Sequence, residues 1–407
     1  MSGPHHLTAP AEERFNVTKL GIIPLALLVA GLACLAVSVL WGIFDTQRFA
    51  FSWLIAFMFV FTICAGTLFW TLLHHALDAD WSVVVRRLLE TIAGLFRPWL
   101  AILFLPVVFL APHLYTWWTK DPAADHLLHI KSPILNHGFF WGFAVFTFVF
   151  FGFFSWLMKH YSTRQDVDGS PWHSIRMRQW SCAGIILFAL TITFAGIMWI
   201  MALDYHWFST MWGVYIFAGT AGSSMATLIL VTNGLKMAGY LKGVVSQEHN
   251  HIMGKLLLAF TIFWAYIAFS QYMLYYYANI PEETIFFMHR NEGTWYHYSI
   301  FLVFGRFFFP FLMLLTQPAK KNPLRICFIA AWILVMHFLD LYWMIMPQFQ
   351  VNTDAATRGP EIKFLLDLVT VVGMVLVLVS IFLRRLPRSP LFPLRDPRLY
   401  ESVTLVN

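Results

Sequence analysis

The sequence has little charge. Only 12% of its 407 residues are Asp, Glu, Lys or Arg, whereas 59% are hydrophobic and 18% are aromatic. Soluble domains carry about 25% charged residues, and a chain this apolar lacks the polar surface to cover a globule in water. We therefore predict an all-α polytopic membrane protein. The formal net charge of +6 does not indicate nucleic-acid binding, because the basic residues lie at the ends of apolar runs and form no single patch.

Cysteine is also scarce, and its placement excludes several kinds of site. All four cysteines lie inside apolar runs and none forms a C-x-x-C pair; they are Cys34, Cys64, Cys182 and Cys327. This pattern excludes a disulfide framework, a zinc knuckle and an iron–sulfur motif, so we expect no metal site. A b-type haem needs two histidines that face each other from different helices, and His337 is the only histidine clearly in the middle of an apolar run. The chain is therefore expected to be a transporter or one subunit of a larger machine.

Ten apolar runs are each long enough to cross a membrane, which takes a helix of about 20 residues. They cover residues 20–44, 49–73, 94–118, 136–158, 181–203, 211–236, 253–277, 297–317, 325–346 and 363–385. The segment 79–93 has an amphipathic pattern and is predicted to be a short helix at the membrane surface. Pro24, Pro106 and Pro310 lie inside the runs and predict kinks that neighbouring helices tolerate.

Lys and Arg are distributed unequally between the two sets of loops. The N-terminal segment, the loops after the even-numbered runs and the C-terminal tail together carry 20 of the 27, and the other loops carry 6. Cytoplasmic loops are enriched in Lys and Arg, so both termini are predicted to be cytoplasmic. The loop at 203–210 then faces outward, and Arg306, which completes the 27, lies inside a predicted span.

Short motifs recur in the two halves of the chain. The triplet Ala-Gly-Thr at 65–67 recurs at 218–220, and His137 at the start of the fourth run recurs as His297 at the start of the eighth. We predict two tandem copies of a four-helix unit. Because four is an even number, the copies have the same orientation and are related by an axis along the membrane normal.

The repeat divides the chain into four predicted parts. Residues 1–48 hold the N-terminus and the first span, 49–203 the first four-helix bundle, 204–346 the second bundle, and 347–407 the tenth span with a basic tail. The first and tenth spans flank the two bundles. Parallel repeats of this kind also occur in secondary transporters.

Three ionisable residues lie deep inside the predicted spans, where charge is costly and each is a candidate for function. Arg306 is in the eighth span, and His337 and Asp340 are in the ninth, three residues apart and so on one face of a helix. A short loop makes these spans antiparallel neighbours. We expect Arg306 to pair with Asp340 and keep it ionised, with His337 as the titratable member. Two interpretations stay open. The residues are functional, as a proton relay or part of a quinone pocket, or they form a structural ion pair.

A second set of titratable residues lies at the predicted outer face. It consists of His137, Asp204, His206 and His297. A quinol releases two protons on oxidation, so its site needs a base near the membrane surface and an apolar slot for ring and tail. His137 with Asp204 fits that chemistry and is the candidate quinone pocket. The alternative is that these are hydrated side chains at the interface.

A third set lies at the predicted inner face. It consists of His74, His75 and Asp78 after the second span, and Glu248 and His249 before the seventh. These positions correspond in the two repeats. They are candidates for admitting protons from the cytoplasm, and the alternative is that they are solvated loop groups.

Several longer motifs resemble one family. The segments are 206–219, 270–272, 279–284, Arg290 and 293–295. They are similar to segments of the large membrane subunits of bacterial alternative complex III, which belong to the NrfD-like, or polysulfide-reductase membrane-subunit, family. The F subunits are the most similar in pattern. The resemblance covers about residues 15–385 and includes the ten spans with their repeat.

The resemblance implies a respiratory complex of the bacterial inner membrane that oxidises menaquinol and passes electrons to a cytochrome c or an oxidase. In that family the iron–sulfur clusters lie in the B subunit, the c-type haems lie in multihaem and monohaem cytochrome subunits, and the sister C subunit holds the quinol site. The present chain would bind no covalent cofactor, with menaquinone as the one candidate ligand. Its expected partners are those subunits, lipids and a terminal oxidase, and no nucleic acid.

The function expected from the resemblance is support of quinol oxidation in the sister subunit together with a proton path. Two alternatives remain, a secondary transporter and a purely structural scaffold. A transporter should carry matched polar clusters in both halves. The cluster around Arg306 occurs only in the second half, since Phe146 and Thr193 stand at about the matching positions of the first.

Overall fold

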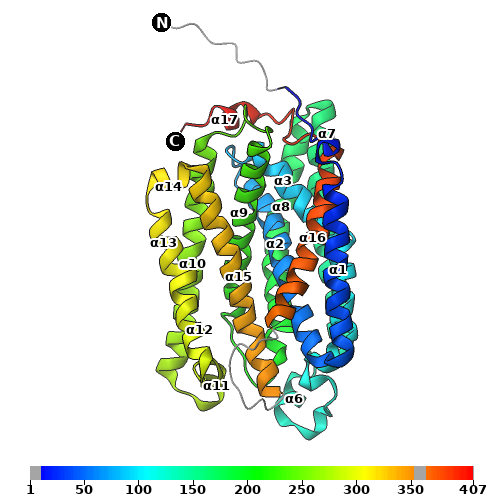
Figure 1. Cartoon of the computed structure of the whole chain (residues 1–407), viewed down its shortest axis with the longest axis vertical. Helices are drawn as coiled ribbons and strands as arrows, with labels where there is room; N and C mark the ends of the chain where they lie inside the picture. The colour runs from blue at the N-terminus through cyan, green and yellow to red at the C-terminus, as the bar shows by residue number, and fades with distance from the viewer. Residues whose placement is uncertain (1–10, 353–363, 407) are drawn as a thin grey trace, which may run out of the picture.

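The computed structural model describes residues 11–352 and 364–406, and every regular element in these ranges is a helix (Figure 1). Ten segments are long and apolar enough to cross a membrane: α1 (Ile23–Phe44), α2 (Thr46–Ala76), α3 (Val83–Ala93) with α4 (Trp99–Phe109), α7 (His137–Asp168), α8 (Pro171–Trp199), α9 (Trp212–Met237), α10 (Gln247–Ala278), α12 (Thr294–Leu302) with α13 (Phe309–Leu314), α15 (Pro323–Asn352) and α16 (Phe364–Arg385). The chain is a multi-pass helical membrane protein, as predicted. The predicted start of the tenth span at 363 lies outside the described residues.

Short helices connect the spans at the two ends of the bundle. They are α5 (Ala111–Leu114), α6 (His126–Lys131), α11 (Pro281–Arg290), α14 (Gln317–Lys321) and α17 (Leu399–Val403). The N- and C-terminal segments meet at one end, where the backbone N–H of Leu391 donates to the carbonyl of Glu13 at 2.9 Å. We call this the terminal end, and the opposite end, with α6 and α11, the far end. Which side of the membrane each faces stays a prediction.

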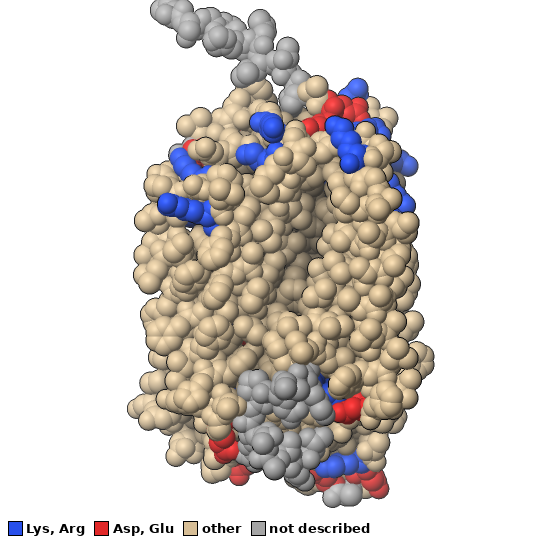
Figure 2. All heavy atoms as spheres, in the orientation of Figure 1, with Lys and Arg blue, Asp and Glu red and all other residues tan. Residues whose placement is uncertain are grey.

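Charged side chains gather at the two ends of the molecule. On the face shown in Figure 2, a broad band of other residues separates the charges at the terminal end from those at the far end. An uncharged band suits the hydrocarbon core of a bilayer, which is about 30 Å thick.

Helix α2 is the central element. It packs against α3, α8, α9, α15 and α16, and its side chains are almost all buried. At its crossing with α9, a Cβ atom on Gly66 would lie 2.3 Å from the carbonyl oxygen of Thr220 and 2.2 Å from Oγ of Ser224. Only glycine permits so close an approach. The two Ala-Gly-Thr triplets therefore meet at this crossing, although the division into two repeated bundles stays a prediction.

Helices α1 and α16 pack on each other along one side of the bundle, on the right in Figure 1. The hydroxyls of Ser38 and Thr370 lie 2.6 Å apart between them. At the start of α16, Asp367 accepts two hydrogen bonds from the guanidinium of Arg48 on α2, at 2.9 and 2.5 Å. The pair is fully buried, so breaking it would leave an uncompensated charge.

The surroundings of the amphipathic segment 79–93 differ from the prediction. Helix α3 is buried along its whole length and does not lie on a membrane surface. Its Arg86 pairs with Asp396 of the C-terminal segment at 2.6 Å, and its Arg87 pairs with Asp166 of α7 at 2.8 Å. Protein covers the polar face because these acids arrive from distant parts of the chain.

Several helices run past the apolar runs that predicted them. Helix α7 continues to Asp168 and ends where Gly169 adopts a left-handed conformation with φ of 67°. Helix α8 then begins at Pro171, with the Ser170 side chain accepting the backbone N–H of Trp172. Polar residues thus extend both helices beyond the membrane-spanning apolar stretch.

Candidate functional site

Arg306 lies in a π-helical turn, η6 (Val303–Phe308), between α12 and α13. Pro310 follows it, and because proline has no N–H, the carbonyl of Arg306 loses its ordinary helical donor. The indole N–H of Trp332 donates to the neighbouring carbonyl of Gly305 at 2.7 Å. Such turns are frequent at functional sites, and this one lies beside the buried guanidinium.

The predicted pairing of Arg306 with Asp340 is confirmed. Nη1 of Arg306 lies 3.3 Å from Oδ2 of Asp340 and donates to the carbonyl of Met336 at 3.0 Å. Nη2 lies 3.2 Å from Nδ1 of His337. Arg306, His337 and Asp340 are all buried, so this contact joins α15 to the turn in the preceding span.

The hydrogen-bond partners of His337 assign its tautomer. Arginine only donates, so Nδ1 accepts from Arg306 and Nε2 carries the proton. Nε2 lies 2.8 Å from the hydroxyl oxygen of Thr62 on α2, and that hydroxyl lies 2.8 Å from the carbonyl of Met58. Both ring nitrogens are therefore engaged. We expected His337 to be the titratable member, but a second proton on Nδ1 would require Arg306 to move away.

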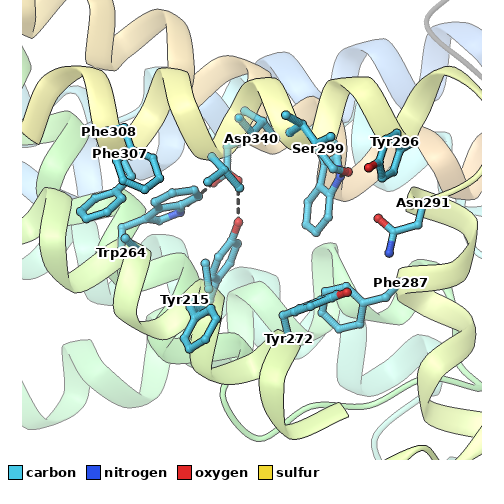
Figure 3. A pocket seen from close by; sticks show the side chains of 17 residues that line it. Tyr215, Trp264, Tyr272, Phe287, Asn291, Tyr296, Ser299, Phe307, Phe308 and Asp340 are labelled. Carbon is cyan, nitrogen blue, oxygen red and sulfur yellow. Dashed lines mark hydrogen bonds between the residues drawn. The ribbon is translucent and has the colours of Figure 1, made fainter. Parts of the chain in front are cut away.

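Asp340 has two further donors, both missed by the sequence analysis. The hydroxyl of Tyr215 donates to Oδ1 at 2.5 Å and the indole N–H of Trp264 donates to Oδ2 at 3.2 Å (Figure 3). The guanidinium of Arg306 also lies over the Trp264 ring, 4.5 Å from its centre. Tyr215 belongs to the segment 206–219, which gave some signal, whereas nothing in the sequence pointed to Trp264.

A cavity of about 450 Å³ adjoins Asp340, between α10, α11, α12 and α15. Its walls are apolar and largely aromatic; the lining residues are Tyr215, Trp264, Ala265, Ala268, Phe269, Tyr272, Phe287, Asn291, Tyr296, Ser299, Ile300, Leu302, Val303, Phe307, Phe308, Asp340 and Trp343. Figure 3 shows Asp340, Tyr215 and Trp264 toward one end and Asn291 and Tyr296 toward the other. Rim residues of α10 and α12 are exposed on the side of the bundle, so the cavity opens toward the membrane.

None of the predicted outer-face residues lines this cavity. His137 is exposed, stacks on the Trp118 ring at 4.2 Å and lies 3.0 Å from its carbonyl oxygen through Nε2. His297 is exposed too. Asp204 pairs with His206, with 3.5 Å between Oδ1 and Nδ1. Within the described residues no contact joins His137 to Asp204, and their part in a quinone pocket stays a prediction.

Tyr205, between Asp204 and His206, fixes the outward-predicted loop to α6. Its hydroxyl donates to Asp125 at 2.6 Å and its carbonyl accepts from Lys131 at 2.6 Å. Burial, followed by the hydrogen bond to Asp125, raises the pKa of Tyr205. The same hydrogen bond lowers the pKa of Asp125, and burial lowers that of Lys131. The contacts of Tyr205 with Asp125 and Lys131 therefore have a structural role, because they hold the loop against α6.

The residues predicted near the inner face divide into two groups. His74 and His75 are buried, and within the described chain their ring nitrogens have no hydrogen-bond partner. The solvated-loop reading is therefore wrong for these two, because α2 extends to Ala76 and carries them inside the bundle. Asp78 is exposed and pairs with Arg398 of the C-terminal segment.

Glu248 and His249 begin α10. Glu248 pairs with Lys321 of α14 at 2.5 Å. Nδ1 of His249 accepts the backbone N–H of Ser246 at 3.1 Å and lies 2.9 Å from the Ser246 hydroxyl. The contacts between Ser246 and His249 cap the helix, and the ion pair of Glu248 joins α10 to α14. A structural role therefore explains both residues.

The site thus holds a buried carboxylate in the wall of an apolar cavity, joined through Arg306 and His337 to Thr62 on another helix. Such an arrangement can accept a proton from a ligand and orient the groups around it. Among the described residues, no group of three or more His, Cys, Asp or Glu side chains could hold a metal ion. In comparisons with known proteins, no protein-family model and no curated protein matches the chain.

Proposed function

We propose that this chain is an integral membrane subunit of a bacterial respiratory complex that oxidises menaquinol, like the F subunits of alternative complex III that its motifs resemble. Its second half would provide a proton path beside the quinol-oxidising sister subunit. The observation that carries the proposal is the Asp340 carboxylate, buried at a membrane-facing aromatic cavity and held by three donors. The chain would lie in the bacterial inner membrane, and both of its termini would face the cytoplasm.

The cavity fits the ring and tail of a quinone. Ligand sites commonly measure about 300–1,000 Å³ and combine apolar walls with a few polar groups, and this one has about 450 Å³. Asp340 and Asn291 are the polar groups that would meet the ring oxygens, and the exposed rim would admit the tail from the membrane. A bound quinol supplies two protons when it is oxidised. The iron–sulfur clusters and haems that take its electrons would lie in partner subunits.

The residues of the chain have distinct tasks in this path. Asp340 accepts the proton, and Tyr215 and Trp264 hold the carboxylate toward the cavity. Arg306 stabilises the anion between proton transfers. Arg306 keeps its own protons, so a proton would pass from Asp340 to His337 through bridging water after Arg306 has moved off Nδ1, and from Nε2 to Thr62 on α2.

The continuation toward the terminal end would run along α2. Twelve residues separate Thr62 from His74, or about 18 Å at 1.5 Å per residue, so this part needs bridging water. The unpartnered ring nitrogens of His74 and His75 are places where buried water would bind. Both histidines lie within electrostatic reach of Arg86, which pairs with Asp396 of the C-terminal segment.

Two other functions make different predictions. A secondary transporter should bind its substrate between the halves and work without redox partners. A structural scaffold would need the Arg306–Asp340 ion pair only for stability. The position of Asp340 on the cavity favours a path over a scaffold, because a purely structural pair needs no access to the membrane.

The test is purification from native membranes in mild detergent, followed by analysis of the co-purifying chains, haem and quinone. The proposal predicts co-purification with multihaem c-type cytochromes and an iron–sulfur protein, and bound menaquinone. A single chain of 47.1 kDa without redox partners would contradict it and favour the transporter.

A further inference from the structure

A second cavity, of about 190 Å³, lies at the terminal end between α3, α7 and the end of α16. Four cationic side chains line it: Arg97, Lys159, Arg385 and Arg388. The only acid in its lining is Glu90. The carboxylate of Glu90 is already opposed by Arg86 at 3.5 Å and Arg87 at 3.4 Å. The cavity therefore has a large excess of positive charge.

Two of the four cations donate hydrogen bonds to neutral acceptors. Lys159 donates to the hydroxyls of Thr91 and Ser389, at 3.1 and 2.9 Å. Arg385 donates to the carbonyls of Gly94 and Arg97, both at 2.5 Å.

The remaining two guanidiniums are open to a ligand. Arg97 lies beside the Trp156 ring, 6.0 Å from its centre, and Arg388 is exposed. Within the described residues none of the four cations forms an ion pair. Like charges that line one small cavity repel each other, so the arrangement favours binding of an anion.

The backbone is shaped to bring Arg97 into this position. A Cβ atom on Gly152 of α7 would lie 3.1 Å from Cγ of Arg97. The glycine thus allows the Arg97 stem to lie against α7. Arg97 and Arg388 line the same cavity, and arginine donates paired hydrogen bonds to phosphate oxygens.

Apolar side chains continue from the cavity along the bundle. On α7, Trp156, Phe153 and Val149 are exposed at helical spacing, in the direction of the far end. On α4, Ile102 and Leu105 are exposed in the same direction. In a membrane these surfaces face lipid chains. A free phosphate ion would gain nothing from them, whereas a lipid would bury its acyl chains there.

We propose that this cavity binds the phosphate of an anionic phospholipid, such as phosphatidylglycerol or cardiolipin, with its acyl chains along α4 and α7. Basic pockets between membrane helices are suited to such headgroups. The inference does not depend on the proposed respiratory function. The lipid would hold α3, α7 and α16 together at the terminal end, where the one acid in the lining, Glu90, already faces Arg86 and Arg87.

The test is native mass spectrometry of the full-length protein as purified from native membranes, reconstituted with phosphatidylglycerol and phosphatidylcholine in equal amounts. The expected result is selective retention of phosphatidylglycerol that millimolar inorganic phosphate does not displace. No preference between the two lipids overturns the proposal. Displacement of the lipid by inorganic phosphate also overturns it and indicates a soluble anion.

A double variant, Arg97→Gln with Arg388→Gln, is expected to lower this retention about tenfold or more, because it removes two charge-assisted contacts. Arg384→Gln is the matched control, since Arg384 is an exposed arginine of α16 that does not line the cavity. Unchanged retention in the double variant, or equal loss in the control, contradicts the assignment. The wild-type lipid preference tests the proposal even where a variant fails to fold.

Discussion

The hydroxyl oxygen of Tyr215 lies 2.5 Å from Oδ1 of Asp340, across the interface between α9 and α15. Tyr215 is 4% exposed and Asp340 is 1% exposed, so the surrounding protein keeps water away from this short contact. It orients the carboxylate at the wall of the aromatic cavity (Figure 3).

Tyr215→Phe removes the hydroxyl donor and keeps the ring. The protein should lose about 1.5–3 kcal/mol of stability, the usual value of a hydrogen bond to a charged group. Quinol-dependent proton release by the complex should slow about tenfold or more, because the acceptor carboxylate is no longer oriented. Tyr272→Phe is the control: Tyr272 lines the same cavity but lies on its exposed rim. Equal effects of the two changes would contradict a specific role for Tyr215.

Ala268→Phe should fill the cavity without touching the charged residues. Ala268 lines the cavity from α10, and a phenyl ring there would occupy the space assigned to the quinone ring. Quinone analysis of the purified complex should show loss of the molecule held by this chain, while that of the sister subunit remains. Ala259→Phe, at an exposed position on the same helix, should leave the quinone content unchanged. Unchanged quinone content in both variants would mean that the cavity holds none.

Gly66→Ala tests the crossing of α2 with α9. The added Cβ would clash with the carbonyl of Thr220, and overpacking of this kind costs about 1–3 kcal/mol. Thermal unfolding of the purified protein in detergent should therefore begin at a lower temperature. Gly142→Ala is the control, because no atom lies within 4 Å of its added Cβ, and it should be neutral or slightly stabilising. A neutral Gly66→Ala would contradict the close crossing.

Asp396→Asn should release the C-terminal segment from α3. Burial opposes ionisation of Asp396, but the charge of Arg86 and its hydrogen bonds outweigh this and lower its pKa below the usual 3.8. A lowered carboxyl pKa stabilises docking at pH values above about 3.8, and this stabilisation is lost as the pH falls through the lower folded value. Removing one member of this buried pair should cost about 3–5 kcal/mol.

Hydrogen exchange of the amides in 391–403 measures this docking. The wild type should stay protected from pH 8 down to about pH 4, while Asp396→Asn should exchange rapidly throughout. Glu401→Gln makes the same change of charge at an exposed position of α17 and should behave as wild type. Loss of wild-type protection above pH 5 would be inconsistent with the ion pair.

The sequence predicted the fold well because a membrane span has a simple signature. Each of the ten apolar runs overlaps a helical span in the described part of the chain, since a lipid-exposed backbone must satisfy its own hydrogen bonds. The pairing of Arg306 with Asp340 was also predictable, because a buried charge needs a partner and the two spans are adjacent. The length of the apolar runs predicted the spans, and the free-energy cost of an unpaired buried charge predicted the ion pair.

The surroundings of each site residue were not predictable in the same way. Trp264 and Tyr215 reach Asp340 from helices that precede it by 76 and 125 residues. Arg86 was predicted at a membrane surface, yet Asp396, 310 residues later, covers it. Such contacts depend on how the helices pack, and neither hydropathy nor periodicity contains that information. The choice of His137 and Asp204 as quinol-site residues stays a prediction, and the sequence did not indicate the contact between His137 and Trp118.

The most direct measurement of the central claim is quinol oxidation and proton release by the assembled complex carrying Asp340→Asn. Asp204→Asn is the control, an acid at the far end that does not line the cavity, and Asp340→Glu should restore part of the activity by restoring the charge. We expect the Asp340→Asn complex to assemble, with turnover and proton release lowered about a hundredfold. Normal turnover with normal proton release in that complex would contradict it and leave the Arg306–Asp340 pair a structural role only.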